Sequence, residues 1–325
     1  MKKNIAVVYG GDSSEFGVSV KSSKNVFESI NAFIYNVWKV QMKGLNWEVY
    51  QDDQVIAKVD KNDFSFVRHC EKINFDFAYI TIHGTPGEDG KLQGYFDMVK
   101  IPYSTCGVYS SALTFNKYFC SNYLRNFDVL MAKSVRLFKG DQVEADQLIK
   151  DLGLPLFVKP NAGGSSFGVT KVKEKAQLLN ALQFAQNESS DILIEEFIDG
   201  PEFTCGLVKL SDQELIFPVT EVIPQNEFFD FEAKYTEGKT DEITPARISL
   251  ELTQKIQELS SRIYDLCDCS GIVRIDYILK DNEFYFLEVN TTPGMTATSF
   301  VPQQIAAMGK KMKDVIGLII EDKLK

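Results

Sequence analysis

The amino-acid sequence predicts an α/β protein, with an N-terminal doubly wound parallel sheet and further α+β units after it. Over residues 1–105, apolar strand-like runs alternate with a helical period, which is typical of βα units. From residue 106 onward, short strands and helices follow in a new arrangement. Because 325 residues exceed the size at which one hydrophobic core stops growing, we expect three units, at 1–105, 106–196 and 197–325.

Four stretches predict the elements of the first unit. The apolar run 4–11 (NIAVVYGG) predicts a buried strand that ends in a glycine turn. Residues 13–30 show helical spacing of apolar side chains, and we expect a helix there with a serine as its N-cap. Further strands are predicted at 34–42 and 75–84, whereas 43–70 has no clear period and carries no detailed prediction.

The rest of the chain is expected to supply helices and strands of two α+β units. Helical spacing predicts the helices, and apolar runs bounded by turn residues predict the strands. The helices are expected at 110–127, 141–152 and 249–267, and the strands at 129–138, 154–160, 192–200, 202–210, 271–279 and 283–290.

Composition and charge exclude several classes of function. The net charge of −10 and a pI near 4.9 argue against broad binding to nucleic acid or to an anionic membrane, because both need clustered Lys and Arg. The six cysteines are scattered, and only Cys267 and Cys269 lie close together, so reduced thiols are favoured over a zinc site. The apolar run near the start is too short for a signal peptide, and a cytoplasmic protein is expected.

Two neighbouring strands near the C-terminus carry acidic and amide side chains in a metal-binding pattern. Glu288 and Asn290 point to the same side of the strand, since successive strand residues face opposite ways. A hairpin turn at 280–283 makes Asp276 a cross-strand neighbour of Glu288, and Arg274 lies on the same face. Two carboxylates and an amide form an oxygen-only ligand set for a hard cation such as Mg²⁺, which usually binds nucleotide phosphates as well.

A glycine- and serine-rich loop suggests a polyphosphate site. The stretch 158–169 (VKPNAGGSSFGV) follows a strand and offers backbone N–H groups and hydroxyls to an anion. It lacks both the P-loop pattern and a following helix, which disfavours a P-loop NTPase and a dinucleotide site. Lys159 and Lys117 are the candidate countercharges. In 192–203, Glu195 and Glu202 fit either contacts to adenine and ribose or solvated surface acids.

These features together resemble the D-alanine–D-alanine ligase family of the ATP-grasp superfamily. The resemblance spans nearly the whole chain, and the histidine-glycine motif and the last motif are highly specific. The motifs follow the family's order, as GGDSSEFGVS at 10–19, HGTPGEDGKLQG at 83–94, FNKYF at 115–119, FFDFEAKY at 228–235 and LEVNTTPGMTATSFVP at 287–302.

The resemblance implies an ATP-grasp fold and a set of ATP-binding residues. It implies two Mg²⁺ or Mn²⁺ ions bound by Asp276, Glu288 and Asn290. It also assigns ATP contacts to six residues. In this assignment Glu195 and Glu202 lie around adenine and ribose, and the three lysines of the group hold the phosphates. That group is Lys117, Lys159, Ser166, Glu195, Glu202 and Lys234.

The resemblance also implies roles in amino-acid binding and catalysis. Glu15 would anchor the ammonium of the first D-alanine with His83 nearby, and Ser299 would contact the carboxylate of the second. The residues with an implied catalytic role are Glu15, Ser165 and Tyr235, which form a hydrogen-bonded set that closes two loops, and Arg274 and the Gly294 N–H, which stabilise the oxyanion.

The implied function is ATP-dependent formation of D-alanyl-D-alanine for peptidoglycan synthesis, by a cytoplasmic homodimer. The sequence departs from the family at Glu196, where a basic residue is common, and at Gly163 and Gly164, where an acid is common. Three alternatives stay open. One is a ligase for other amino acids or for a hydroxy acid such as D-lactate, and another is a non-catalytic nucleotide-binding module. An oxidoreductase is disfavoured, because the first βα unit lacks the G-x-G-x-x-G spacing.

Overall fold

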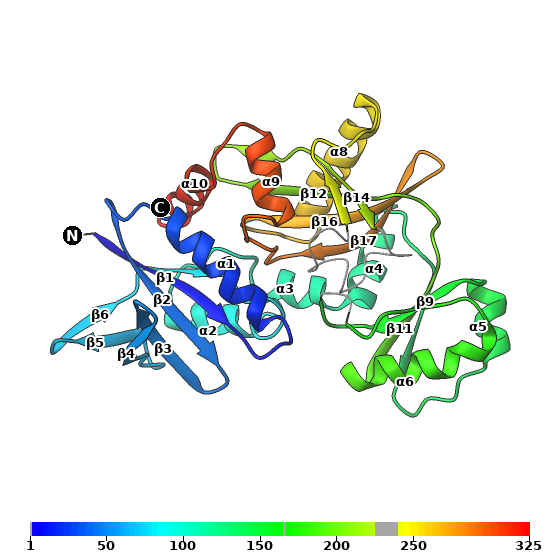
Figure 1. The fold of residues 1–325 in the computed structure, drawn as a ribbon, viewed down its shortest axis with the longest axis horizontal. Coiled ribbons are helices and arrows are strands. Elements are labelled where there is room, and N and C mark those ends of the chain that lie inside the picture. The colour runs from blue at the N-terminus through cyan, green and yellow to red at the C-terminus, as the bar shows by residue number, and fades with distance from the viewer. Residues whose placement is uncertain (1, 165–166, 225–239) are drawn as a thin grey trace.

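The computed structural model describes residues 2–164, 167–224 and 240–325, and it confirms the α/β class (Figure 1). Three larger sheets and one short hairpin account for the strands in this part of the chain. The strands of the first sheet come from the N-terminal quarter, those of the second from residues 134–196, and those of the third from residues 202–290. The limits of the three expected units stay a prediction.

The first sheet has a parallel core, as predicted, extended by two antiparallel strands. Its order is β4-β3-β2-β1-β7, with β1 parallel to both β2 and β7. Strands β3, β4 and β5 lie within 43–70, where the sequence shows no clear period, and β6 follows directly and pairs with β5 as a separate hairpin. The bounds are β1 Lys3–Gly10, β2 Tyr35–Lys43, β3 Asn46–Gln51, β4 Gln54–Lys58, β5 Ser65–Arg68, β6 Glu71–Asn74 and β7 Phe77–Ile80.

Helix α1 (Phe16–Ser29) follows β1, but the serine N-cap predicted for it is wrong. The N-cap is Glu15, whose side chain makes no capping hydrogen bond. The Ser13 hydroxyl is used elsewhere, because it donates to the His83 carbonyl O at 2.7 Å and accepts from the Glu15 N–H at 3.2 Å. The helix start is therefore joined to the loop after β7, and Glu15 lies at the junction.

The second sheet has the order β10-β9-β11-β8 and is fully antiparallel. Its strand β8 is shorter than the strand predicted at 129–138, because only the second half of that run joins the sheet. In the first half, Met131 makes an isolated bridge to Phe286 of the third sheet. Helices α5 and α6 supply the apolar side chains of its core. The bounds are β8 Ser134–Phe138, α5 Ala145–Leu152, β9 Leu156–Pro160, β10 Thr170–Val172, the 3₁₀ helix η1 Lys175–Gln177, α6 Leu178–Glu188 and β11 Asp191–Glu196.

The third sheet has the order β15-β14-β12-β16-β17, with β13 paired to β12. Its long helix α8 (Leu250–Leu266) begins after Ser249, whose hydroxyl accepts from the Leu252 N–H, and it packs against the sheet as its helical spacing predicts. The remaining bounds are β12 Glu202–Lys209, β13 Glu214–Ile216, β14 Thr220–Pro224, β15 Thr240–Ile243, β16 Val273–Lys280 and β17 Glu283–Asn290.

The single helix predicted over 110–127 is wrong in one respect, because the chain breaks at Asn116. The residue has extended backbone angles, and it ends α3 (Val108–Phe115) and begins α4 (Lys117–Arg125). Its carboxamide oxygen accepts from the Phe119 N–H at 3.0 Å and from Asn161 Nδ2 at 3.0 Å. Capping and the tie to the end of β9 favour the break, and Lys117 becomes the first residue of α4.

The C-terminal helices connect the third sheet to the first. Helices α9 (Phe300–Ala307) and α10 (Met312–Lys323) complete the chain, and α2 (Lys91–Val99) lies with the first sheet. One core cluster contains side chains of β1, α1, β12, α9 and α10, so the two parts share a continuous apolar interface. Among the described residues, no helix is long and apolar enough to span a membrane.

Candidate active site

The β16–β17 hairpin brings the predicted acidic and amide side chains together. The register pairs Asp276 with Glu288, as expected, and Arg274 with Asn290. An irregularity between Asp276 and Tyr277 shifts the pairing by one residue, since the turn alone would place Leu287 opposite Asp276. Asp281 and Asn282 occupy the turn with φ of 53° and 62°, a conformation that Asp and Asn tolerate. Asp276, Glu288 and Asn290 therefore lie beside one another at one end of the hairpin.

Asp276 is the most heavily hydrogen-bonded member of this group. Its Oδ1 accepts from Thr204 Oγ1 at 2.6 Å and from Arg274 Nε at 2.9 Å. Its Oδ2 accepts from an Arg274 terminal nitrogen at 2.8 Å and from Asn290 Nδ2 at 3.0 Å. The residue is buried, so the bidentate arginine supplies the counter-charge that a buried carboxylate needs.

Lys117 connects the hairpin to the glycine loop. From the first turn of α4, its Nζ donates to the Gly163 carbonyl O at 2.8 Å and lies 3.2 Å from Glu288 Oε2. Its backbone N–H donates to the Asn161 carbonyl O at 3.1 Å. The ammonium is thus held between the loop expected to cover phosphates and the carboxylate expected to bind a metal ion.

Lys159 and Glu195 form an ion pair on one face of the second sheet. Lys159 lies on β9 and Glu195 on β11, and their charged atoms are 2.5 Å apart. Both side chains are largely buried. The pair compensates the burial of the two charges, and a bound phosphate would supply a second counter-charge to the ammonium.

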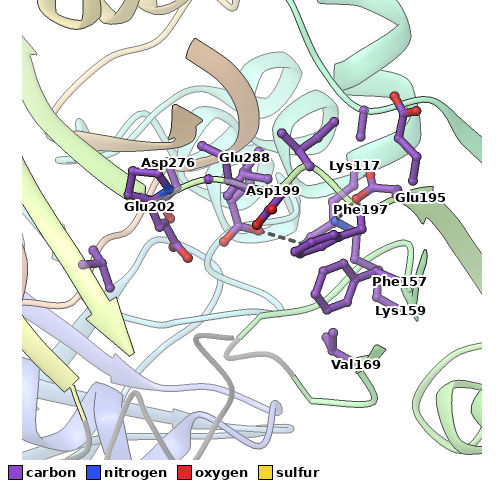
Figure 2. Close-up of a pocket in the computed structure, with 18 of the residues that line it drawn as sticks. Lys117, Phe157, Lys159, Val169, Glu195, Phe197, Asp199, Glu202, Asp276 and Glu288 are labelled. Carbon is purple, nitrogen blue, oxygen red and sulfur yellow. Dashed lines mark ion pairs between the residues drawn. The ribbon is translucent and has the colours of Figure 1, made fainter. Parts of the chain in front are cut away.

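These residues surround a cavity of about 470 Å³ between the second and third sheets (Figure 2). Phe157 and Phe197 form part of its wall, with ring centroids 6.0 Å apart, and Lys171 Nζ lies 3.8 Å from the Phe197 centroid. An apolar, aromatic wall next to charged groups suits a purine base joined to phosphates. Of the predicted site residues, the cavity is lined by Lys117, Lys159, Glu195, Glu202, Asp276 and Glu288.

Glu196, a departure from the family pattern, is engaged in holding the start of the second sheet. One of its carboxylate oxygens accepts from the Lys133 N–H at 2.8 Å, and the other lies 3.9 Å from Lys133 Nζ. Its backbone N–H donates to the Lys133 carbonyl O at 3.0 Å. The acid therefore fixes Lys133, the residue directly before β8, to the end of β11.

On the N-terminal side, Glu15 lies against the glycine loop. A Cβ added to Gly164 would be 2.6 Å from Glu15 Oε2, so a larger residue there would displace the Glu15 carboxylate. The family commonly has an acid at this place, where this chain has Gly163 and Gly164. In this chain the Glu15 carboxylate lies against Gly164 instead. Glu15 and His83 are not among the residues that line the 470 Å³ cavity.

His83 and Glu88 are buried titratable groups next to Glu15. Burial lowers the pKa of His83, which favours a neutral imidazole, and its Nε2 lies 3.2 Å from Ser22 Oγ. Removal from water raises the pKa of Glu88 to about 8, with the Glu15 and Glu288 carboxylates adding to the rise. Glu88 accepts from the Gly84 N–H at 2.7 Å. Glu88 lies in the motif at 83–94, but the resemblance assigns no role to it. In the sequence, the one indication of a role is a charged residue placed between two glycines of that motif.

Gly294 and Ser299 are close to each other after the turn that follows β17. A Cβ added to Gly294 would lie 2.8 Å from Ser299 Oγ. The Ser299 hydroxyl is held by the Thr296 N–H at 3.1 Å and by Thr296 Oγ1 at 2.7 Å. Within the described residues, the Gly294 N–H donates to no protein acceptor. Four other predicted residues, Ser165, Ser166, Lys234 and Tyr235, lie outside the described residues.

The ligand set of the hairpin fits a hard divalent cation. In the part of the chain that the structure describes, no three His, Cys, Asp or Glu side chains are placed to share a metal ion. Asp276 and Glu288 supply two carboxylates, and the Asn290 carboxamide beside them supplies the kind of oxygen that completes such a ligand set. Asn290 Nδ2 donates to Asp276 Oδ2, so the carboxamide is tied to one of the two carboxylates.

Comparisons with known proteins agree with this geometry. The family model described as D-ala D-ala ligase N-terminus matches residues 4–106, and the one described as D-ala D-ala ligase C-terminus matches residues 124–321. The chain belongs to the D-alanine–D-alanine ligase family. A D-alanine–D-alanine ligase of Bacteroides fragilis is 53% identical over 324 residues, which cover 99% of this chain and 100% of the relative.

Solved structures of the ligase family share the fold. The VanG D-Ala:D-Ser ligase from Enterococcus faecalis has a TM-score of 0.88 and 32% identity, over 99% of both chains. A D-alanine–D-alanine ligase from Bacillus anthracis complexed with ATP has a TM-score of 0.78 and 28% identity, over 99% of this chain and 97% of that one. The ATP-grasp fold expected from the motifs is thereby confirmed.

Proposed function

We propose that this ligase joins two D-alanine molecules to D-alanyl-D-alanine, with conversion of ATP to ADP and phosphate. The observation that carries the proposal is the convergence of Lys117, Lys159, Asp276 and Glu288 on one cavity with an aromatic wall. Two cations and two carboxylates around one space suit a nucleotide triphosphate and its metal ions. The full-length similarity to named D-alanine–D-alanine ligases supports this substrate.

In the first step, a carboxylate oxygen of one D-alanine attacks the γ-phosphorus of ATP. A P–O bond forms, the bond to the β-phosphate oxygen breaks, and ADP leaves with the electron pair. Lys117 and Lys159 are placed to hold the phosphates and to balance the negative charge of the transferring group. Mg²⁺ held by Asp276, Glu288 and Asn290 would supply further neutralisation of phosphate charge when bound.

In the second step, the amine of the second D-alanine attacks the acyl carbon of the acyl phosphate. The carbonyl becomes a tetrahedral oxyanion, the bond to the phosphate oxygen then breaks, and the amine gives up a proton as the peptide forms. Arg274 and the Gly294 N–H are the proposed donors to this oxyanion. Arg274 is oriented for the task by its bidentate contact with Asp276.

Glu15 is the proposed anchor for the first ammonium group, and Ser299 the proposed contact for the second carboxylate. His83 acts near the same substrate by fixing the surrounding chain, because its Nε2 pairs with Ser22. Glu195 and Glu202 lie at the cavity wall where adenine and ribose would bind. Ser165, Ser166, Lys234 and Tyr235 keep the loop-closing and phosphate-binding roles implied by the motifs, as proposals only.

We further propose a cytoplasmic homodimer that feeds peptidoglycan synthesis and binds neither nucleic acid nor membrane. The net charge of −10 supports the last point. The choice of acceptor is the open alternative, since a structural relative is named a D-Ala:D-Ser ligase. Serine differs from alanine by one hydroxyl, so selection rests on the contacts around Ser299 and on residues outside those described.

The test is phosphate release with ATP, Mg²⁺ and D-alanine, with the product identified by mass spectrometry. We expect release that depends on D-alanine and a product with the mass of the dipeptide. Parallel reactions with L-alanine, D-serine and D-lactate set the specificity, and we expect D-alanine to be preferred. Phosphate release that does not respond to D-alanine would contradict the proposal, and a mixed dipeptide as main product would favour the alternative.

A further inference from the structure

The turn that carries Gly294 is hydrogen-bonded to side chains of the N-terminal part of the chain. It runs from Thr292 to Met295, and both of these residues are buried. Asn25 Nδ2 on α1 donates to the Met295 carbonyl O at 2.7 Å, and the Met295 N–H donates to Ser22 Oγ at 3.2 Å. One turn of α1 thus satisfies both backbone groups of the residue after Gly294.

The other side of the turn is held by the histidine-glycine loop. The Thr292 N–H donates to Glu88 Oε1 at 3.2 Å, while the second oxygen of Glu88 accepts from the Gly84 N–H. The His83 ring also lies close to the Thr292 backbone. The peptide groups on both sides of Pro293 and Gly294 are therefore fixed by residues that lie about 200 or more positions away in sequence.

The hydrogen-bond roles within this group are mutually consistent. A neutral imidazole has one donor and one acceptor nitrogen. If His83 donates to the Thr292 carbonyl, its Nε2 accepts from the Ser22 hydroxyl, which in turn accepts from the Met295 N–H. Every donor then has one acceptor, and the chain of bonds closes around the turn.

We propose that Ser22, Asn25 and Glu88 are positioning residues that aim the Gly294 N–H at the oxyanion of the second step. The inference rests on the proposed function, because it assumes that Gly294 is an oxyanion donor. Gly294 has no side chain to restrain it, so its direction depends on its neighbours, and an oxyanion donor works when it lies about 2.7–3.1 Å from the oxyanion. The N-terminal unit thereby takes part in the amide-forming step as well as in substrate binding.

The experiment compares Asn25→Ala and Ser22→Ala with Ser23→Ala in the full-length protein. Ser23 is the matched control, because it is a buried serine on the same helix whose hydroxyl donates to the Val20 carbonyl within α1 and makes no bond to the turn. Rates are normalised to sites that bind a non-hydrolysable ATP analogue, so that loss of folded protein does not count as loss of catalysis.

We expect turnover to fall about tenfold in Asn25→Ala and Ser22→Ala and less than twofold in Ser23→Ala, with the KM for ATP unchanged. The double variant should lose less than the product of the two single losses, because both side chains hold Met295. Rapid-quench measurement should show a burst of one ADP per site in the two slow variants, since phosphoryl transfer needs no oxyanion donor.

Three outcomes would overturn the inference. Unchanged turnover in both variants would show that the hydrogen bonds from α1 to Met295 are not needed to position the turn. Slowed turnover without the ADP burst would place the defect in the first step, and an equal loss in Ser23→Ala would show a general effect on the helix. If the wild-type protein forms no dipeptide, the proposed function itself fails, which is a distinct result.

Discussion

Replacing Gly294 by alanine tests the site at a close contact with Ser299. The added Cβ would lie 2.8 Å from Ser299 Oγ and 3.4 Å from Ser299 Cβ. Ordinary contact begins at 3.4 Å, so the Ser299 hydroxyl must move by about 0.6 Å or the turn must shift by as much. The hydroxyl is held by two hydrogen bonds to Thr296, and movement would weaken at least one of them.

The expected loss follows from the size of this displacement. Because a shift of about 1 Å in a reacting group can cost about 100-fold, we expect kcat/KM for D-alanine to fall about 10- to 100-fold, or about 1.4 to 2.7 kcal/mol. The KM for ATP should not change, since the ATP cavity is formed by other residues. The assay is phosphate release at saturating ATP, with thermal unfolding as a check on folding.

Gly317 provides the matched control. It lies within α10, where a Cβ would meet nothing within 4 Å, so Gly317→Ala should leave activity unchanged and add about 0.5 to 1 kcal/mol of stability. Full activity of Gly294→Ala would refute the reasoning, because it would mean that neither Ser299 nor the turn has to stay where the structure places it.

Three further predictions follow from individual contacts. Asn116→Ala should lower the free energy of unfolding by about 1 kcal/mol in urea titrations, because it removes the cap of α4, and no change would mean that the cap is dispensable. For Asp191, burial opposes ionisation, but hydrogen bonds from Arg136 and Asn161 outweigh it and lower the pKa. Its stabilisation is therefore present above pH about 4 and lost as the pH falls through the depressed folded-state pKa, so Asp191→Asn should flatten acid unfolding over that window, and an unaltered acid profile would contradict this. Removal of divalent metal with EDTA should abolish D-alanine-dependent phosphate release and leave the far-UV circular dichroism unchanged; release that persists would exclude a required metal ion.

The hairpin of the site could be predicted from sequence because its geometry is local. The turn rich in Asp and Asn predicts that the two strands pair, and the period of two places Glu288 and Asn290 on one face. The register shift between Asp276 and Tyr277, which brings Glu288 opposite Asp276, is not visible in the local pattern. The first strand and its helix are likewise encoded in local apolar spacing. Only the N-cap was misassigned, because Ser13 is engaged by the His83 carbonyl, 70 positions away.

The remaining features depend on contacts that no local pattern carries. The break at Asn116 is fixed by Asn161, and the ion pair of Lys159 with Glu195 depends on the pairing of β9 with β11. The role of Glu88 appears only when the turn after β17 is packed against the histidine-glycine loop. These positions were visible as polar residues, but their partners are set by tertiary packing.

The most direct test of the account is whether the hairpin carboxylates bind a divalent ion together with nucleotide. Mn²⁺ binding can be followed by electron paramagnetic resonance in the presence of a non-hydrolysable ATP analogue, for the wild type, Glu288→Gln and Glu283→Gln. Glu283 is the control, because it lies on the same strand but pairs with Lys255 at the exposed end. We predict at least tenfold weaker Mn²⁺ binding in Glu288→Gln and no change in Glu283→Gln. Equal affinity in all three proteins would contradict the account.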